Sequence, residues 1–238
     1  MINKKMDPNN TALLVFSLSA KKEVVRKPIG DGHRPEEQEA LFNLLIANTR
    51  NLAAQCGVDF YWVDEHEQIG DNFSSRFTNA FQKLFDAGYD NVISIGNDSP
   101  DLTTQLLQDA VHKLESNKMV LGPSKDGGVY LIGLSKEIFH HGTFLNFRWQ
   151  TSFLLDSLKD HIDTHKIDVE ILRELSDIDS RKDLEDYAKS NPTSLLSKLF
   201  KLLIASLNRK WKRTLEAVPL AIHLSNIGLR APPVFNSF

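Results

Sequence analysis

The sequence lacks the features that mark exported, membrane-anchored or thiolate-rich proteins. Cys56 is its only cysteine, which excludes an intramolecular disulfide and a metal site built from several thiolates. No segment offers the ~20 apolar residues of a membrane-spanning helix, and Met1 to Asn10 lacks the apolar core of a secretory signal. We therefore expect a cytoplasmic protein without a membrane anchor, with Cys56 as a buried thiol.

The sequence also lacks an excess of basic charge. Its 28 Lys and Arg residues face 31 Asp and Glu residues, and the formal net charge of -3 gives no field that would attract nucleic acid. Apolar residues make up 41% and charged residues 25%, which excludes a disordered or fibrous chain. A chain of 238 residues therefore predicts one large globular domain rather than two small ones, with no nucleic acid as partner.

Several catalytic and nucleotide-binding motifs are missing. The chain has neither a P-loop nor a Gly-x-Gly-x-x-Gly pattern, and Ser99 does not lie in a Gly-x-Ser-x-Gly setting. The pair His140-His141 lacks a third ligand at metal spacing, so surface histidines are the better interpretation. These absences argue against a serine hydrolase and a histidine metal site.

The sequence does contain a regular alternation of apolar strands and amphipathic helices. Thr11 to Ser19 is predicted as a buried strand, and the charged stretch from Lys21 to Pro35 as a loop. The other predicted strands are Val58–Val63, Asn91–Ile95, Met119–Gly122, Val129–Leu134 and Val169–Leu175, and predicted helices begin near Glu36, Phe73, Thr103, Gln150 and Ser180. This alternation predicts an α/β fold with a mainly parallel sheet and helices on both faces.

The C-terminal region reads as an appended element. Asn191-Pro192 interrupts the chain before a helix expected over about 193–215, which has one apolar and one basic face. We expect one domain over residues 1–190, followed by this helix and a tail over 191–238. The apolar face needs a partner surface, either its own domain or a second copy in a homodimer. A membrane surface is less favoured because the rest of the chain is acidic.

Polar residues that directly follow apolar strands are the best candidates for chemistry, because ligands bind beyond the carboxyl ends of parallel strands. Asp98 follows the strand Asn91–Ile95, and a carboxylate there suits Mg²⁺ or Mn²⁺ with nucleotide phosphates as further ligands. The alternative for such residues is helix capping, which we favour for Asp101, with Thr103 as a second candidate cap.

Two further clusters follow later strands. Asp126-Gly127-Gly128 would present a carboxylate on a backbone that a ligand can approach, although a plain turn between strands has the same composition. Asp177-Ile178-Asp179 places two acids at i and i+2, which point the same way on an extended segment. These two acids either supply further metal ligands or cap the following helix.

Taken in order, four segments resemble one family. They are Gly-Asn-Asp-Ser-Pro-Asp-Leu from Gly96, Leu-Gly-Pro-x-x-Asp-Gly-Gly-Val-Tyr-Leu from Leu121, Arg148-Trp149-Gln150-Thr151, and Ser-Asp-Ile-Asp-Ser-Arg-Lys-Asp-Leu from Ser176. The chain resembles, from about Thr11 to Tyr187, the glycosyltransferase-A-like family of unknown function in the nucleotide-diphospho-sugar transferase superfamily. That family includes proteins associated with arsenosugar biosynthesis.

The resemblance implies a Rossmann-like sheet that binds a sugar nucleotide or a nucleoside triphosphate with a divalent cation. By this similarity Asp98 matches the metal-binding aspartate, Asp179 the second metal ligand, and Asp126 an acceptor-side residue that orients or deprotonates a hydroxyl. The residues implied on the ligand side are Gly96, Gly127, Gly128 and Arg76, the last within a Gly-x-x-x-x-x-Arg pattern that begins at Gly70.

One departure concerns the first loop, where the family has a glycine-containing segment ending in Lys-Thr-Arg-Leu. This chain has no glycine before Gly30, so the backbone freedom of a phosphate-cradling loop is missing. Lys21, Arg26 and Lys27 remain as basic groups for phosphate contact. Two functions follow: a metal-dependent transferase acting on a nucleotide-activated donor, or a catalytically inactive nucleotide-binding or assembly module that keeps the fold.

Overall fold

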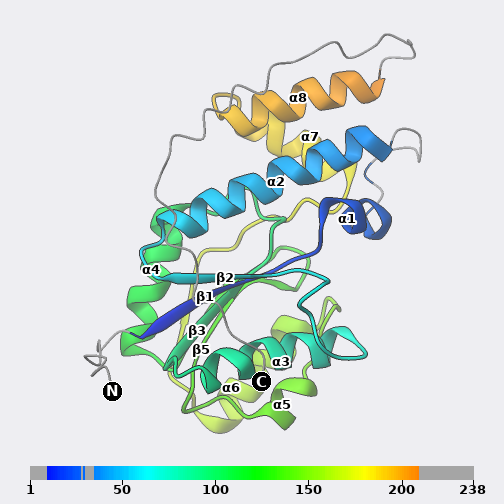
Figure 1. The fold of residues 1–238 in the computed structure, drawn as a ribbon. Coiled ribbons are helices and arrows are strands. Elements are labelled where there is room, and N and C mark those ends of the chain that lie inside the picture. Colours follow the sequence, from blue (N-terminus) through cyan, green and yellow to red (C-terminus); the bar gives the residue numbers. More distant parts are fainter. Residues whose placement is uncertain (1–9, 28, 30–34, 209–238) are drawn as a thin grey trace, which may run out of the picture.

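The computed structural model describes residues 10–27, 29 and 35–208, which form an α/β fold around one six-stranded sheet (Figure 1). The strands are β1 (Thr11–Phe16), β2 (Asp59–Val63), β3 (Asn91–Ile95), β4 (Met119–Pro123), β5 (Val129–Ser135) and β6 (Val169–Ile171). The helices are α1 (Ala20–Arg26), α2 (Pro35–Gln55), α3 (Phe73–Asp86), α4 (Thr104–Ser116), α5 (His141–Leu145), α6 (Leu154–His165), α7 (Arg181–Ser190) and α8 (Leu195–Asn208).

The strand order is β2-β1-β3-β5-β4-β6. β1 pairs in parallel with β2 and β3, and β4 pairs in parallel with β6, whereas β5 is antiparallel to both of its neighbours. The short turn between β4 and β5 forces this direction, because a parallel connection needs a crossover of about a dozen residues. The predicted α/β fold with a mainly parallel sheet is confirmed, and β5 is the exception within it.

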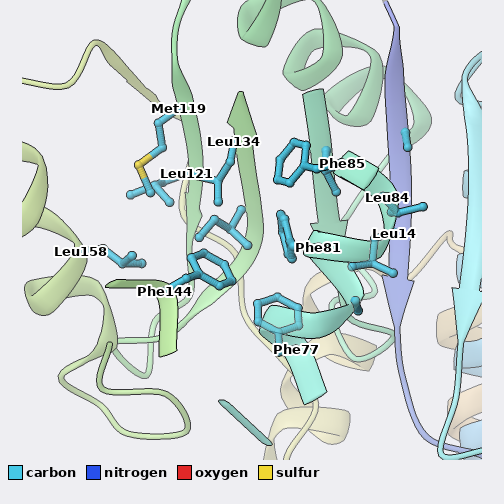
Figure 2. Close-up of a cluster of buried hydrophobic side chains, with 14 of the residues drawn as sticks. Leu14, Phe77, Phe81, Leu84, Phe85, Met119, Leu121, Leu134, Phe144 and Leu158 are labelled. Carbon is cyan, nitrogen blue, oxygen red and sulfur yellow. The ribbon is translucent and has the colours of Figure 1, made fainter. Parts of the chain in front are cut away.

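One face of the sheet is covered by α3, α5 and α6 (Figure 1). Figure 2 shows how Phe77, Phe81 and Phe85 of α3 point toward the strands, where they pack with Leu14 and Phe144. Phe81 and Phe85 are fully buried, as the spacing of four residues along the helix requires. The four-residue repeat therefore places these phenylalanines on the core face of the helix.

The opposite face carries α4 and the end of α2. Leu13 and Val15 of β1 point into this second cluster, whereas Ala12 and Leu14 point into the first, as the two-residue period of a strand dictates. Cys56 lies in the second cluster as a buried free thiol, and burial raises its pKa to about 11. Both faces of the sheet are therefore closed.

A third layer packs on α2: α7 and α8 lie above α2 in Figure 1, and α1 contributes Ala20 to the same apolar cluster. Phe200 of α8 is fully buried against Leu41 and Phe42 of α2 and Leu184 of α7. In the part that the structure describes, most of the predicted apolar face of the C-terminal helix therefore packs on its own chain, whereas Leu195 at its start is 72% exposed. Residues 209–215 of that predicted helix lie outside the described residues.

Several boundaries differ from the sequence prediction, and the first strand, for example, ends at Phe16 rather than Ser19. The loop expected from Lys21 is wrong in its first part, because Ala20–Arg26 is a helix that contains neither Gly nor Pro. The helix expected from Gln150 begins only at Leu154, since Gln150 has a φ of 59°, which a helix does not tolerate. The last strand ends at Ile171 rather than Leu175.

Within the described residues, none of the helices has the length and apolar content that crossing a membrane requires.

The third layer can be tested by removing its central side chain. Phe200→Ala should lower the free energy of unfolding by about 3–5 kcal/mol, because it empties a fully buried site. The matched control on the same helix is Leu202→Ala, which is 68% exposed and should change stability by less than about 0.5 kcal/mol. Urea unfolding of both variants measures the difference. Equal, small effects would show that α8 does not pack on α2 in solution.

Candidate functional site

A cleft of about 600 Å³ opens beyond the carboxyl ends of β1 and β3. Its floor is the end of β3 and the residues that follow, from Ser94 to Asp98. One wall comes from the connection after β1 and from α3, and the other from the β4–β5 turn and the segment before α6. Asp177 and Asp179 close the cleft from the segment before α7.

The loop after β3 fixes the position of Asp98. A Cβ at Gly96 would come 2.8 Å from Asp98 Oδ1, so a larger residue there would have to displace the Asp98 carboxylate. The backbone N–H of Ile178 donates to the Asp98 carbonyl oxygen at 2.8 Å, which ties the segment before α7 to this loop. The Ile178 side chain is buried beneath α2, α7 and α8, so Asp177 and Asp179 on either side of it face the cleft.

Lys27 joins two of these carboxylates. Its Nζ lies 2.6 Å from Asp98 Oδ2 and also donates to Asp179 Oδ1. Arg26 Nη2 approaches Asp98 Oδ2 from the same side at 3.8 Å. The Lys27 side chain is only 13% exposed, so its ammonium is held between the two carboxylates.

Both members of this ion pair are charged at neutral pH. Burial by itself would raise the pKa of Asp98, but the positive charges of Lys27 and Arg26 outweigh burial and lower it. Burial would likewise lower the pKa of Lys27, but the charges of Asp98 and Asp179 outweigh burial and raise it. A permanent charge pair therefore lies at the floor of the cleft.

Asp177 differs from Asp98 in its protonation state, because its pKa is raised rather than lowered. Burial and the neighbouring negative charge of Asp98 raise its pKa to about 7. Ser99 donates a hydrogen bond from its hydroxyl to Asp177 Oδ1, which only partly opposes that rise. Asp98, Asp177 and Asp179 thus bring three carboxyl groups together in the cleft, and Asp177 holds its proton up to about neutral pH.

Glu23 is a site residue that sequence reasoning missed. It is 2% exposed within the cleft wall, and Arg26 Nε donates to its carboxylate at 3.1 Å. Burial raises its pKa, although the charges of Arg26 and Lys27 oppose that effect. The signal available in the sequence was the i, i+3 spacing of Glu23 and Arg26, which is informative only once this stretch is known to be a helix.

The predicted Asp126-Gly127-Gly128 cluster forms the β4–β5 turn on the opposite wall. Asp126 Oδ1 accepts a hydrogen bond from the backbone N–H of Gly128 at 2.9 Å. Gly127 has a φ of 88°, and a Cβ there would come within 2.1 Å of the Ser152 carbonyl oxygen. Glycine is needed at position 127 because the turn packs closely against the segment before α6.

That segment adds residues that sequence reasoning did not assign to the ligand. Trp149, Gln150, Thr151 and Ser152 all line the cleft. Gln150 adopts a left-handed backbone with a φ of 59°, a conformation that non-glycine residues hold only where the surroundings enforce it. Trp149 Nε1 donates to the Phe144 carbonyl oxygen at 2.7 Å, which fixes its indole ring beside the cleft.

The remaining predicted basic residues lie at different places. Arg76 of α3 lines the cleft, and its guanidinium makes no ion pair within the described part of the chain. Gly70, with a φ of 140°, lies against Ser75 and Arg76 at the start of that helix. Lys21 is exposed on α1 and is not among the residues that line the cleft.

The capping alternatives are resolved by the hydrogen bonds. The hydroxyl of Thr103 caps α4 by accepting from the Leu106 N–H at 3.1 Å. The cap predicted for Asp101 is therefore wrong, because the Asp101 carboxylate instead accepts from Asn191 Nδ2 at 3.3 Å. Ser180 caps α7, with Asp183 completing the capping box, which leaves Asp177 and Asp179 free of that role.

A divalent cation does not fit between Asp98 and Asp179 in this arrangement, because the ammonium of Lys27 stands where the ion would bind. Within the described residues, no group of three or more His, Cys, Asp and Glu side chains is placed to hold a metal ion. The arrangement offers instead a fixed positive charge on Lys27, with Arg26 and Arg76 near it on the cleft wall.

Residues 38–151, slightly less than half of the chain, match the model of a family described as an uncharacterized protein conserved in bacteria (DUF2064). The fold is similar to the crystal structure of a candidate nucleotide-diphospho-sugar transferase from Desulfovibrio desulfuricans G20. The TM-score is 0.73 at 23% identity, over 84% of this chain and 98% of that one. These matches confirm the resemblance to a glycosyltransferase-A-like family of unknown function.

More distant solved structures share less of the fold. A 4-diphosphocytidyl-2C-methyl-D-erythritol synthase from Anaerococcus prevotii has a TM-score of 0.46 at 9% identity, over 85% of this chain and 98% of that one. A manganese complex of a Mycobacterium tuberculosis protein has a TM-score of 0.45 at 12% identity, over 76% and 98%. Likenesses of this size carry no argument about the site. No curated protein matches the sequence.

The raised pKa of Asp177 predicts a pH-dependent stability. The folded protein keeps a proton up to about pH 7 that an unfolded aspartate loses near pH 4, so this group makes folding less favourable as pH rises through that range. Asp177→Asn mimics the protonated acid and removes the effect. Relative to wild type, the variant should gain more than ~1.4 kcal/mol of stability between about pH 5 and about pH 8, the free energy of one pKa unit.

Urea unfolding at both pH values measures this gain, and a ¹³C titration of the Asp177 carboxyl locates the midpoint directly. A difference between variant and wild type that stays constant with pH would contradict the assignment.

Proposed function

We propose that this chain, whose fold is that of the nucleotide-diphospho-sugar transferases, transfers a group from a nucleotide-activated donor to an acceptor hydroxyl. The donor is a sugar nucleotide or a nucleoside triphosphate. The observation that carries the proposal is the set of basic groups, Arg26, Lys27 and Arg76, around a cleft beyond the carboxyl ends of β1 and β3. Open α/β sheets bind ligands at this edge.

The dimensions and the walls of the cleft suit such a donor. Its volume of about 600 Å³ falls in the range of roughly 300–1,000 Å³ that is usual for small-ligand sites. Phe16, Phe73 and Trp149 give one part of the wall an aromatic surface against which a base or a sugar ring can pack. The basic groups would meet the phosphates.

The reaction requires little covalent chemistry from the protein itself. An acceptor oxygen forms a bond to the transferred group, the bond to the departing phosphate oxygen breaks, and the hydroxyl proton passes to a base. Asp126, on the wall opposite the basic groups, is the candidate to orient the hydroxyl or accept its proton. Fixed positive charge beside the departing phosphate stabilises the negative charge that develops there.

The requirement for Mg²⁺ or Mn²⁺ at Asp98 and Asp179 that the sequence analysis expects is not part of this proposal. Such an ion would have to displace the ammonium of Lys27 from both carboxylates. No step of the reaction above depends on it.

The alternative function is a catalytically inactive nucleotide-binding or assembly module. The observation that favours it is the neutralisation of Asp98 by Lys27 and Arg26, which leaves that carboxylate little basicity for catalysis. Turnover separates the two: hydrolysis or transfer of a bound sugar nucleotide supports the transferase, whereas binding without turnover for any acceptor supports the module. A homodimer through the C-terminal helix likewise stays a prediction.

Arg76 provides the test of donor binding with the least structural disturbance, because its removal leaves no partner unpaired in the described part of the chain. Arg76→Ala should weaken the binding of nucleoside diphosphates or triphosphates about tenfold, equivalent to ~1.4 kcal/mol. The matched control is Lys83→Ala, an exposed basic residue on the same helix that does not line the cleft. Calorimetry with uridine, cytidine, guanosine and adenosine nucleotides measures the affinities.

If Arg76→Ala bound the best nucleotide as tightly as Lys83→Ala, the phosphates would not lie in this cleft. If none of the nucleotides bound to wild type, the proposed function would be wrong.

A further inference from the structure

Lys27 is placed as a structural cation rather than as a surface lysine. Its ammonium contacts Asp98 from the loop after β3 and Asp179 from the segment before α7, and its side chain is 13% exposed. Two carboxylates from distant segments that converge on one point are the arrangement with which proteins hold a divalent cation. Here a side chain of the same protein supplies the positive charge at that point.

The backbone around Lys27 holds it in place. The Lys27 N–H donates to the Glu23 carbonyl oxygen at 2.8 Å, which makes Lys27 the C-terminal cap of α1. At the other end of α1, both the N–H and the hydroxyl of Ser19 donate to the carboxylate of Glu65. Beyond Lys27, Ile29 is 2% exposed in the cluster beneath α2 and α8. The backbone that carries the Lys27 side chain is therefore held in place on both sides of this residue.

The charges near Lys27 leave little attraction for a further dication. Asp98 and Asp179 are each paired with Lys27, and Glu23 is paired with Arg26. A metal ion that entered would push a poorly hydrated ammonium away from its partners and would meet Arg26 at the same carboxylate, where like charges repel.

We propose that Lys27 takes the place of a divalent cation in this cleft, so that the donor's phosphates bind to a fixed ammonium and do not need Mg²⁺ or Mn²⁺. An ammonium has three N–H donors, and Asp98 and Asp179 use two of them. Among residues 10–27, 29 and 35–208 no other side-chain contact engages the third, which can therefore serve a phosphate oxygen. This inference rests on the proposed function for its ligand, but the exclusion of the metal is a property of the protein alone.

The first experiment measures Mn²⁺ binding without nucleotide, by electron paramagnetic resonance of the free ion. Wild type should leave Mn²⁺ free at concentrations up to the millimolar range. Lys27→Met removes the charge and keeps most of the unbranched side chain, and it should bind Mn²⁺ at least about tenfold more tightly. The double variant Lys27→Met with Asp98→Asn should lose that gain. Two outcomes overturn the proposal. One is tight Mn²⁺ binding by wild type that is lost in Asp98→Asn, and the other is a folded Lys27→Met that binds Mn²⁺ no more tightly than wild type.

The second experiment measures calorimetric affinity for the best nucleoside diphosphate in EDTA and in Mn²⁺. Wild type should bind equally in both, within about twofold, whereas Lys27→Met should lose about tenfold in EDTA and recover part of that loss in Mn²⁺. Lys27→Arg keeps the charge and should stay independent of metal. Wild-type binding that needs Mn²⁺ overturns the proposal, and wild-type affinity can be read even if Lys27→Met fails to fold.

The two proposals fail separately. If no nucleotide binds in either buffer, the proposed function is wrong, while the Mn²⁺ measurement still decides whether Lys27 occupies the place of a cation.

Discussion

The ammonium of Lys27 connects three segments that are far apart in the sequence: the end of α1, the loop after β3 and the segment before α7. The electrostatics of the cleft depend on this contact. Burial raises the pKa of Asp177 to about 7, and the charge that Lys27 maintains on Asp98 adds to that rise. Without the ammonium, three carboxyl groups would face one another in a partly buried space, and their mutual repulsion would have to be relieved by protonation or by a bound cation.

The topology of the sheet explains why the two walls of the cleft meet at one edge. β1 and β3 are parallel neighbours, so the connections after them leave the sheet side by side. β4 runs in the same direction and β5 returns against it, so the turn with Asp126 and Gly127 emerges at that same edge. A single antiparallel strand thus places the candidate acceptor wall opposite the basic wall without any further element.

The third layer supports the cleft from behind. Ile178 lies between the two acids of the segment before α7 and is buried together with Ile29 and Phe200. The packing of α8 in this cluster therefore stabilises the backbone at Asp177 and Asp179. It also stabilises Ile29, which follows Lys27 closely in the chain. In this chain a short helix that ends at Arg26 occupies the place where the family it resembles has a glycine-containing loop. The adaptable backbone of such a loop is replaced by side-chain charges in fixed positions.

The sequence by itself determined the local features. The predicted strand Asn91–Ile95 has the bounds of β3, and the position of Asp98 after that strand predicted its place at the cleft. These follow from periodicity and propensity, which act over a few residues.

Only the tertiary structure decided that Lys27 meets Asp98, 71 residues away, and that Glu23 is buried. The order of strands in the sheet sets such contacts, and the local pattern does not encode that order. The charge of each carboxyl was likewise undetermined, because it depends on burial and on neighbours that the fold alone brings together.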